Sequence, residues 1–374
     1  MRLIILCFLL GIVLYGCQNK TPKIELPKPP LIQYDFSDSS LTYRIDTFLE
    51  KRFREKRFNG VALFAKHNKI VYHEAFGFSN FKTKDSLSKN DAFQLASVTK
   101  PITAIAILQL VEQGKIHLDS VVQHYIPVFP YSGITIRNLL SHRSGLSNYM
   151  YFIDEIWEDK FKPISNDTML AIMTRMMPKT YYPPDVAYHY CNTNYALLAT
   201  IIERVTNLSY EEYLQNNIFD RAEMQQSFVY NKCKTAKIPQ EVLGHNAKFK
   251  LKDDIYLNGV VGDKGIYASA LDLYKLDRKL HELVSDSLLQ IAYSSHNSGL
   301  LERGKDDYGL GWRLQKDNTF GQVVFHSGWW KGFKTYYIRL LDQDSTIVIL
   351  TNVTKGGFLN KMALQRLLFS KHQL

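Results

Sequence analysis

The chain has 374 residues, of which 45% are hydrophobic and 22% charged, a composition ordinary for a globular protein with a sizeable core. Its 23 tyrosines and 21 phenylalanines exclude an intrinsically disordered chain. The formal net charge of +10 would suit a nucleic acid or an anionic surface, but basic and acidic residues are mostly interleaved, so we expect no nucleic-acid partner.

The N-terminus has the pattern of an export signal. Arg2 precedes an apolar run over residues 3–15, which is too short to span a bilayer but fits the central region of a signal peptide. The run ends in Leu-Tyr-Gly-Cys, which is similar to a bacterial lipobox whose cysteine, here Cys17, is lipidated. We therefore expect a signal peptide over 1–16 and an exported, membrane-anchored lipoprotein at the periplasmic or cell surface. The alternative is a plain cleaved signal, with Cys17 incidental.

A proline-rich tether is expected over 17–39, and the folded domain over 40–374. The domain begins with apolar residues at helical spacing, including Ile45 and Leu49, beside the densest basic run of the chain, 51–57. This combination predicts an amphipathic helix with a solvated basic face.

Strand-like runs lie near both ends of the domain, and mainly helical patterns lie between them. Strands are predicted over 60–66, 70–77, 323–326, 335–341 and 346–351, and helices over 102–111, 195–205 and 358–370, with a further helix behind a capping box at Ser209 and Glu212. We therefore predict an α/β fold in which N- and C-terminal strands share one antiparallel sheet. The helical block would be an insertion packed beside that sheet, with a ligand-binding cleft at the boundary.

The pattern Ser-x-x-Lys occurs three times, beginning at Ser79, Ser86 and Ser97. The first two lie in the polar segment 79–90, which we interpret as a loop. Ser97 instead opens the long apolar helix, where unpaired backbone N–H groups favour a developing oxyanion and where Lys100 lies on the same helical face. This context favours Ser97 as a nucleophile activated by Lys100. The alternative is a serine that only caps the helix and a lysine at the surface.

Tyr190 and Asn192 form a Tyr-x-Asn pattern just before the helix predicted over 195–205. A tyrosine whose pKa is lowered by a neighbouring ammonium can act as a general base, and an amide can hold a substrate carbonyl. A second Tyr-x-Asn pattern, Tyr256 and Asn258, lies in a glycine-rich stretch without a helix after it. The alternative for the first pattern is a polar helix cap with packed tyrosines.

His326 and Gly328 belong to the His-x-Gly pattern of this chain, at the end of a predicted strand. An edge strand there could pair with an extended acyl substrate, and the N–H of Trp329 could complete an oxyanion hole with that of Ser97. A competing Lys-Gly-Gly at 355–357 is better interpreted as the turn into the final helix. Considered alone, His326 would be a structural histidine.

In their order and context these motifs resemble the serine β-lactamase and penicillin-binding-protein superfamily, in the branch of class C-like β-lactamases, DD-peptidases and related esterases. The resemblance covers about residues 40–374. It includes further segments at 139–146 (LLSHRSGL), 265–273, 308–312 and 350–352.

The resemblance implies an antiparallel sheet flanked by N- and C-terminal helices, with an inserted helical domain. It further implies that Ser97 attacks a carbonyl carbon while Lys100 and Tyr190 manage the proton. Asn192 would position the substrate, and His326 would provide polarity near a substrate carboxylate. The acyl-enzyme would then be hydrolysed by a water that Tyr190 activates.

Three features of the chain qualify the resemblance. Arg143 replaces a residue that is small in relatives, and Asp263-Lys264 stands where relatives often carry glycines. Trp329-Trp330 would narrow the cleft or offer it an apolar wall, which counts against β-lactam turnover more than against acylation. His142 belongs to the resembling segment, and we interpret it as structural.

No metal-ligand spacing is present, so we expect no metal and no cofactor. Cys191 and Cys233 could form one disulfide. The function expected is an exported serine hydrolase of an ester or amide, either DD-peptidase-like, a D-amino-acid peptidase or a carboxylesterase. Its partner would be a small molecule or a peptide, with cell-wall peptides as candidates. The alternative is a penicillin-binding sensory module that is acylated without efficient turnover.

Overall fold

The computed structural model describes residues 31–235, 237–238, 242–252, 254–296, 306–317 and 319–369. The expected signal peptide, the lipidation site at Cys17 and most of the expected tether lie outside these described residues. One compact unit spans Ile32–Leu374, and within it Tyr34 forms a bridge with Ile70. Among the helices of the described ranges, none combines the length and apolar character that crossing a membrane requires.

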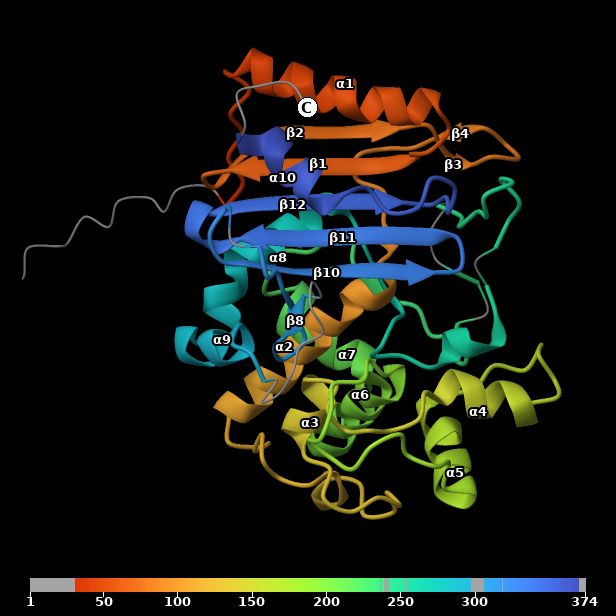
Figure 1. Cartoon of the computed structure of the whole chain (residues 1–374). Helices are drawn as coiled ribbons and strands as arrows, with labels where there is room; N and C mark the ends of the chain where they lie inside the picture. The colour runs from red at the N-terminus through yellow and green to blue at the C-terminus, as the bar shows by residue number, and fades with distance from the viewer. Residues whose placement is uncertain are drawn as a thin grey trace, which may run out of the picture. The chain divides into compact units, whose positions relative to one another are not determined.

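The main element of this unit is a seven-stranded antiparallel sheet in the order β2-β1-β12-β11-β10-β9-β8 (Figure 1). Its strands are β1 (Gly60–Lys66), β2 (Lys69–Phe76), β8 (Asp307–Tyr308), β9 (Arg313–Leu314), β10 (Val323–Trp330), β11 (Phe333–Leu340) and β12 (Ser345–Thr351). β1 pairs antiparallel with β12, which confirms that strands from the two ends of the chain share one sheet. β11 and β12 are joined by a short 3-10 helix, η5 (Leu341–Gln343), followed by Asp344 in the left-handed region.

β10 is longer than the sequence predicted. The prediction ended the strand at His326, but the ladder with β11 continues to Trp330, which lies opposite Phe333. Tryptophan has a high strand propensity, and Gly328 lets the strand pass where a side chain could not fit. The His-x-Gly pattern therefore lies inside a strand.

The helices are α1 (Ser39–Arg54), α2 (Thr99–Glu112), α3 (Ile136–Leu140), α4 (Tyr149–Ile156), α5 (Asn166–Met176), α6 (Asn192–Thr206), α7 (Tyr210–Leu214), α8 (Ala270–Leu283), α9 (Asp286–Ala292) and α10 (Lys361–Phe369). The helices predicted over 102–111 and 195–205 lie within α2 and α6. The capping box of Ser209 and Glu212 begins α7 as predicted. In α1, Ile45 and Leu49 are buried and the basic residues face outward, so the predicted amphipathic helix is confirmed.

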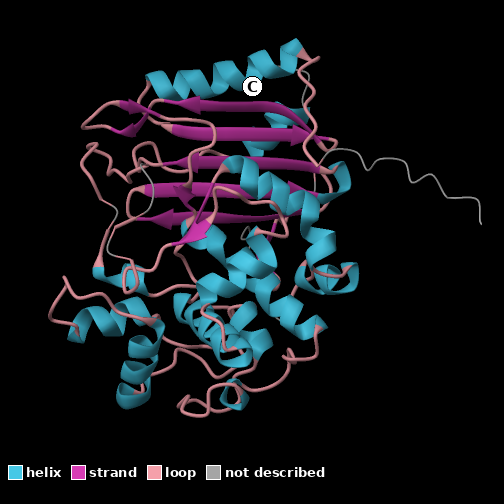
Figure 2. Ribbon diagram, turned by 180° about the vertical axis from the view of Figure 1, so that it is seen from behind, coloured by secondary structure: helices cyan, strands magenta, loops and turns pink. Residues whose placement is uncertain are grey.

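Side chains that point alternately to the two faces of the sheet form two separate apolar layers. In β1, Ala62 and Phe64 pack with α1 and α10, whereas Val61 and Leu63 face the larger core that includes Leu273 of α8. Successive side chains of a strand point to opposite faces, so one strand serves both layers. The helices α2–α7 gather beside the sheet, and Figure 2 shows sheet and helices as adjoining parts of the unit. The α/β fold with a largely helical insertion is confirmed.

Two small sheets complete the unit. They contain β3 (Phe78–Asn80) with β4 (Asp85–Ser86), and β5 (Phe93–Gln94) with β7 (Ile266–Ala268) and β6 (Phe228–Val229). The first corrects the prediction of a loop over 79–90, since a short hairpin forms there. Its two strands are too short for a periodic pattern to reveal them. The second small sheet leads directly to Ser97.

Candidate active site

Ser97 lies in a turn between a short strand and the most deeply buried helix. β5 is followed by a 3-10 turn, η1 (Ala96–Val98), and then by α2, so Ser97 precedes the α-helix that it was expected to open. Leu95 holds this turn in place, because its N–H donates to the carbonyl of Ile266 at 2.9 Å. Ala96 has φ +51°, a conformation that costs energy for a residue with a Cβ and is often found at functional sites. Ser97 is partly exposed, while its neighbours on both sides are buried.

Lys100 extends from the first turn of α2 to the Ser97 hydroxyl. Its Nζ lies 3.0 Å from Ser97 Oγ, and it donates to Asn192 Oδ1 at 2.8 Å and to the Asp263 carbonyl at 2.9 Å. The side chain is completely buried. Burial lowers the pKa of Lys100 to about 7, and the positive charge of Arg313 contributes in the same direction. A substantial fraction of this amine is therefore neutral near pH 7 and able to accept a proton.

Tyr190 lies beside this pair, just before α6. The Lys100 ammonium is 5.0 Å from the centre of the Tyr190 ring, and the centre of the His142 ring, tilted relative to it, lies 4.3 Å away. We expected the ammonium to lower the pKa of Tyr190. The pKa is instead raised, because desolvation of the phenol outweighs the opposing effects of Arg313 and of a hydrogen bond with Ser97. Tyr190 is therefore a neutral phenol in the free protein, and of the two groups the Lys100 amine is the one able to accept a proton near pH 7.

Asn192 is the first residue of α6, so the helix begins three residues earlier than predicted. Its Oδ1 accepts from Lys100, and its Nδ2 lies 3.6 Å from the sulfur of Met150. The sulfur is a weak acceptor, which leaves the amide N–H groups available for a stronger one. Asn192 thus joins the Ser97–Lys100 pair from a separate helix.

Gly328 brings β10 against the turn that holds Ser97. A Cβ added at Gly328 would lie 2.2 Å from the carbonyl oxygen of Leu95 and 3.0 Å from the Cβ of Ala96. Thr335 of the neighbouring strand donates to the same Leu95 carbonyl at 2.7 Å. β9 pairs with β10 only at Val324 and Phe325, so the stretch from His326 onward has no strand partner on that side among the described residues. This stretch forms a strand edge next to Ser97.

His326 is completely buried and uncharged. Burial keeps its pKa well below the usual value, and the charges of Arg313 and Lys100 add to this effect. Its Nδ1 lies 2.8 Å from the Ser327 carbonyl, which can only accept, so Nδ1 carries the proton. Nε2 therefore accepts from the Tyr308 hydroxyl at 3.1 Å. Both ring nitrogens of His326 are used within the protein.

The two tryptophans of β10 differ. Trp330 donates from Nε1 to Asn258 Oδ1 at 2.8 Å and lies 5.2 Å from the Lys264 ammonium, so it is fixed in the structure. Trp329 is 67% exposed and could form the apolar wall anticipated from the sequence. The rival Tyr256 and Asn258 are occupied elsewhere, since Tyr256 donates to Asp154 at 2.6 Å.

Asp263 and Lys264 form a buried ion pair behind Lys100, and sequence reasoning had noted them only as a departure from relatives. Lys264 Nζ is 3.6 Å from Asp263 Oδ1, and it donates to the Tyr149 hydroxyl at 3.0 Å. Burial lowers the pKa of Lys264 to about 8. The Asp263 carboxylate raises the pKa of Lys100 and so opposes the larger effect of burial, which lowers it.

Arg313 is a further residue that sequence reasoning missed. It follows the Tyr308–Trp312 segment and lies 5.2 Å from the centre of the Tyr190 ring and 5.9 Å from that of Tyr308. Its positive charge acts to lower the pKa values of Lys100, Tyr190 and His326, although burial raises that of Tyr190 overall. The only sequence signal was its position directly after a recognised segment.

The other residues that the sequence analysis singled out lie in positions that suit a structural role. Ser79 donates to the Asp85 carbonyl at 3.2 Å, and Ser86 is exposed in the hairpin. His142 is buried, uncharged and accepts from the Cys191 N–H at 3.1 Å. Arg143 pairs with Asp185 at 2.6 Å.

Cys191 and Cys233 remain free thiols, the first buried and the second exposed, so the possible disulfide does not form. Residues 355–357 form the turn after β12, as predicted. Within the described ranges, no three His, Cys, Asp or Glu side chains gather as a metal site would require.

The chain is similar to known proteins over most of its length. The Beta-lactamase family model matches residues 45–370. Over 324 residues the chain is 33% identical to Penicillin-binding protein 4* of Bacillus subtilis, covering 82% of this chain and 71% of that protein. It is 28% identical over 331 residues to Protein flp of Staphylococcus aureus, covering 83% of this chain but only 62% of that protein.

Two solved structures are similar to this chain over most of their length. A penicillin-binding protein from Bacillus halodurans is 26% identical with a TM-score of 0.75, covering 86% of this chain and 99% of that one. A D-amino acid amidase from Ochrobactrum anthropi is 19% identical with a TM-score of 0.71, covering 84% of this chain and 92% of that one, a likeness in fold.

Proposed function

The chain belongs to the beta-lactamase family of serine hydrolases, and we propose that it hydrolyses an ester or amide through an acyl-enzyme on Ser97. One observation carries this proposal. The Lys100 amine is completely buried, lies 3.0 Å from Ser97 Oγ and has a pKa of about 7. A neutral amine at that distance can accept the serine proton as the hydroxyl attacks, so the nucleophile and its base are already positioned.

The proposed reaction has two halves. Ser97 Oγ bonds to the substrate carbonyl carbon while its proton passes to Lys100, with the Tyr190 phenol relaying it to the leaving amine or alcohol. The oxyanion is stabilised by the backbone N–H groups of Ser97 and Trp329, an arrangement favoured by the close approach of Gly328 to Leu95. Water then attacks the ester of Ser97, and its proton returns to the serine oxygen through the same groups.

The acyl substrate is proposed to lie along the edge of β10 from His326 to Trp329. An extended backbone can pair with such an edge. The exposed Trp329 indole offers an apolar wall, which favours an apolar acyl group or side chain. The proposed export favours peptides of the cell-wall type, and carboxylic esters are the competing class.

The test uses the purified protein, a fluorescent penicillin and a panel of p-nitrophenyl esters. Covalent labelling together with ester turnover is the expected result. If the protein is not labelled and does not turn over the esters, the mechanism is contradicted. Stable labelling without turnover would favour the sensory alternative, in which deacylation is slow.

The pH dependence of turnover tests the role of Lys100. Activity requires the neutral amine, so kcat/KM is expected to fall as pH drops through about 7. The Asp263→Asn variant removes a carboxylate that raises the pKa of Lys100, and this acid limb should move to lower pH. The Arg313→Gln variant removes a charge that lowers the same pKa, so the limb should move to higher pH.

The measurement is kcat/KM for p-nitrophenyl acetate across the neutral range, with melting curves to verify that each variant is folded. Shifts of both variants in the same direction, or no shift in either, would assign the limb to a group other than Lys100.

We also propose that the mature protein is exported and anchored by a lipid on Cys17, which would place Ser97 near cell-envelope substrates. The lipobox-like sequence before Cys17 supports this. Mass spectrometry of the mature N-terminus should find a lipid-modified Cys17, and a Cys17→Ala variant should lack the modification. An unmodified start downstream of residue 17 would contradict the anchor.

A further inference from the structure

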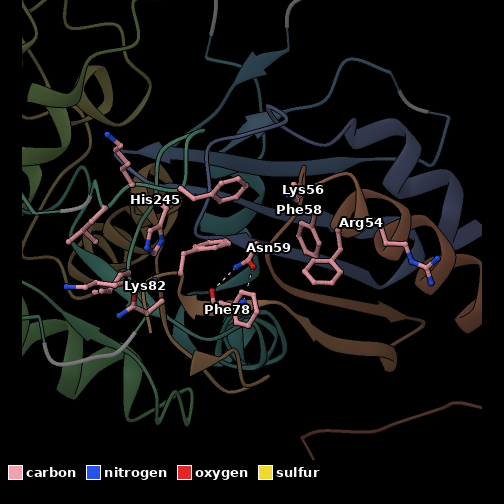
Figure 3. A pocket seen from close by; sticks show the side chains of 14 residues that line it. Arg54, Lys56, Phe58, Asn59, Phe78, Lys82 and His245 are labelled. Carbon is pink, nitrogen blue, oxygen red and sulfur yellow. Dashed lines mark hydrogen bonds between the residues drawn. The ribbon is translucent and has the colours of Figure 1, made fainter. Parts of the chain in front are cut away.

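A large cavity lies apart from Ser97, where the end of α1, the strand β3 and the segment 243–251 meet (Figure 3). Its volume of about 840 Å³ is within the range of small-molecule sites. None of the residues assigned to the active site lines it. The cavity therefore needs an explanation of its own.

The wall of this cavity is aromatic. Five phenylalanines line it: Phe53, Phe58, Phe78, Phe81 and Phe249. Phe81 is central, since its ring centre lies 5.9 Å from that of Phe78 and 4.8 Å from that of Phe249. Such a wall excludes a purely polar ligand and favours an apolar chain or ring.

Hydrogen bonds fix the wall before any ligand arrives. Asn59 receives the N–H of Phe78 at 2.9 Å and donates to its carbonyl at 2.8 Å, as Figure 3 shows. Phe249 has φ +59°, which is rare for a bulky residue and is maintained only where surrounding contacts impose it. The Asn246 side chain imposes it here by accepting from the N–H groups of Lys248 and Lys250.

The rim of the cavity is cationic. Arg54, Lys56, Lys82 and Lys250 line it, and no acidic residue is among its lining residues. Arg54 is paired with Glu50 at 2.6 Å. For the three lysines, no carboxylate within the described ranges lies at ion-pair distance. An apolar cavity with an uncompensated cationic rim attracts a negative charge to its mouth.

We propose that this cavity binds a single-chain amphiphile with an anionic head group, of the fatty-carboxylate class. The chain packs among the phenylalanine rings, and the carboxylate lies among Lys56, Lys82 and Lys250. A neutral apolar molecule would leave the rim unused, and a cationic one would be repelled by it. Lys82, which completes a Ser-x-x-Lys pattern that the active site does not use, thereby has a binding role.

The test is isothermal titration of the purified protein with dodecanoate below its critical micelle concentration. Saturable binding of one equivalent is expected. Dodecyltrimethylammonium, with the same chain and the opposite charge, should bind at least about tenfold more weakly, and dodecyl phosphate should bind comparably to dodecanoate. Equal binding of the anionic and cationic probes would overturn the assignment of the head group.

Two variants test the location. Phe81→Ala removes the central ring and should weaken dodecanoate binding by about tenfold or more, and Lys82→Glu with Lys250→Glu should do the same through charge. Phe161→Ala and Lys115→Glu change exposed residues outside the cavity and serve as matched controls. Unchanged ester turnover in Phe81→Ala would verify its fold. Wild-type affinity in the Phe81 and lysine variants would exclude this cavity as the site, whatever the outcome at Ser97.

Discussion

Replacing Ser97 with alanine is expected to abolish covalent labelling by a fluorescent penicillin and to reduce ester turnover by on the order of 10³-fold or more. Without Oγ no acyl bond can form, and the Lys100 amine 3.0 Å away has no hydroxyl to deprotonate. The loss should therefore appear in kcat, with labelling absent even after long incubation. The measurements are gel fluorescence of the labelled protein and the rate of p-nitrophenolate release.

The matched control is Ser86→Ala, which changes a serine in the same Ser-x-x-Lys pattern. Ser86 is exposed in the β3–β4 hairpin, so its variant should be labelled and turn over like the wild type. Ser97 is only partly exposed but loses a single hydroxyl, so Ser97→Ala should melt close to the wild type. Labelling of Ser97→Ala at the wild-type rate would place the nucleophile elsewhere.

The sequence singles out Ser97 as the proposed nucleophile by its neighbourhood and not by the motif itself. Three serines had the same spacing to a lysine, and only Ser97 preceded a continuous apolar run, which is the deeply buried α2. Local pattern is informative here because a buried helix must be apolar on nearly all sides. The same reasoning could not predict the 3-10 turn or the left-handed Ala96, because these depend on β7 and β10, which pack against the turn.

The electrostatics of the site were the least predictable part. The sequence suggested that an ammonium would lower the pKa of Tyr190, but the structure encloses the phenol among His142, Tyr308 and other groups far apart in the chain. Likewise, Lys100 donates to a backbone carbonyl of Asp263, 163 positions further on. Burial depends on such long-range packing, so the direction of a pKa shift cannot be obtained from spacing alone.

Replacing Lys100 with methionine is expected to slow acylation by about 10²–10⁴-fold, the usual contribution of a general base. Methionine approximates the length and volume of the lysine stem but cannot accept a proton. Labelling by penicillin should become slow without disappearing, since Ser97 and the proposed oxyanion donors remain. Because the titrating amine is gone, the fall in kcat/KM below about pH 7 should disappear from the residual activity. Retention of that acid limb in Lys100→Met would mean that another group is the base.

The same variant should not lose stability at neutral pH, which separates a catalytic role from a structural one. Burial lowers the Lys100 pKa from 10.5 to about 7, which at 1.36 kcal/mol per pKa unit means that the buried ammonium destabilises the native state by several kcal/mol. Methionine removes this cost. It leaves the Asp263 carbonyl without its donor, at about 1–3 kcal/mol, whereas water can replace the bond to the half-buried Asn192.

The stability difference has a defined pH dependence. Between about pH 7 and about pH 10.5 the unfolded lysine holds a proton that the native one does not, so wild-type stability rises with pH over this window. Lys100→Met lacks this gain, so its melting temperature should equal or exceed that of the wild type near pH 7, and the difference should shrink toward pH 10. A variant that is less stable than the wild type at pH 7, by a margin that does not change with pH, would mean that the hydrogen bonds of Lys100 outweigh its desolvation. In that case Lys100 would stabilise the folded site through its hydrogen bonds as well as act as the base.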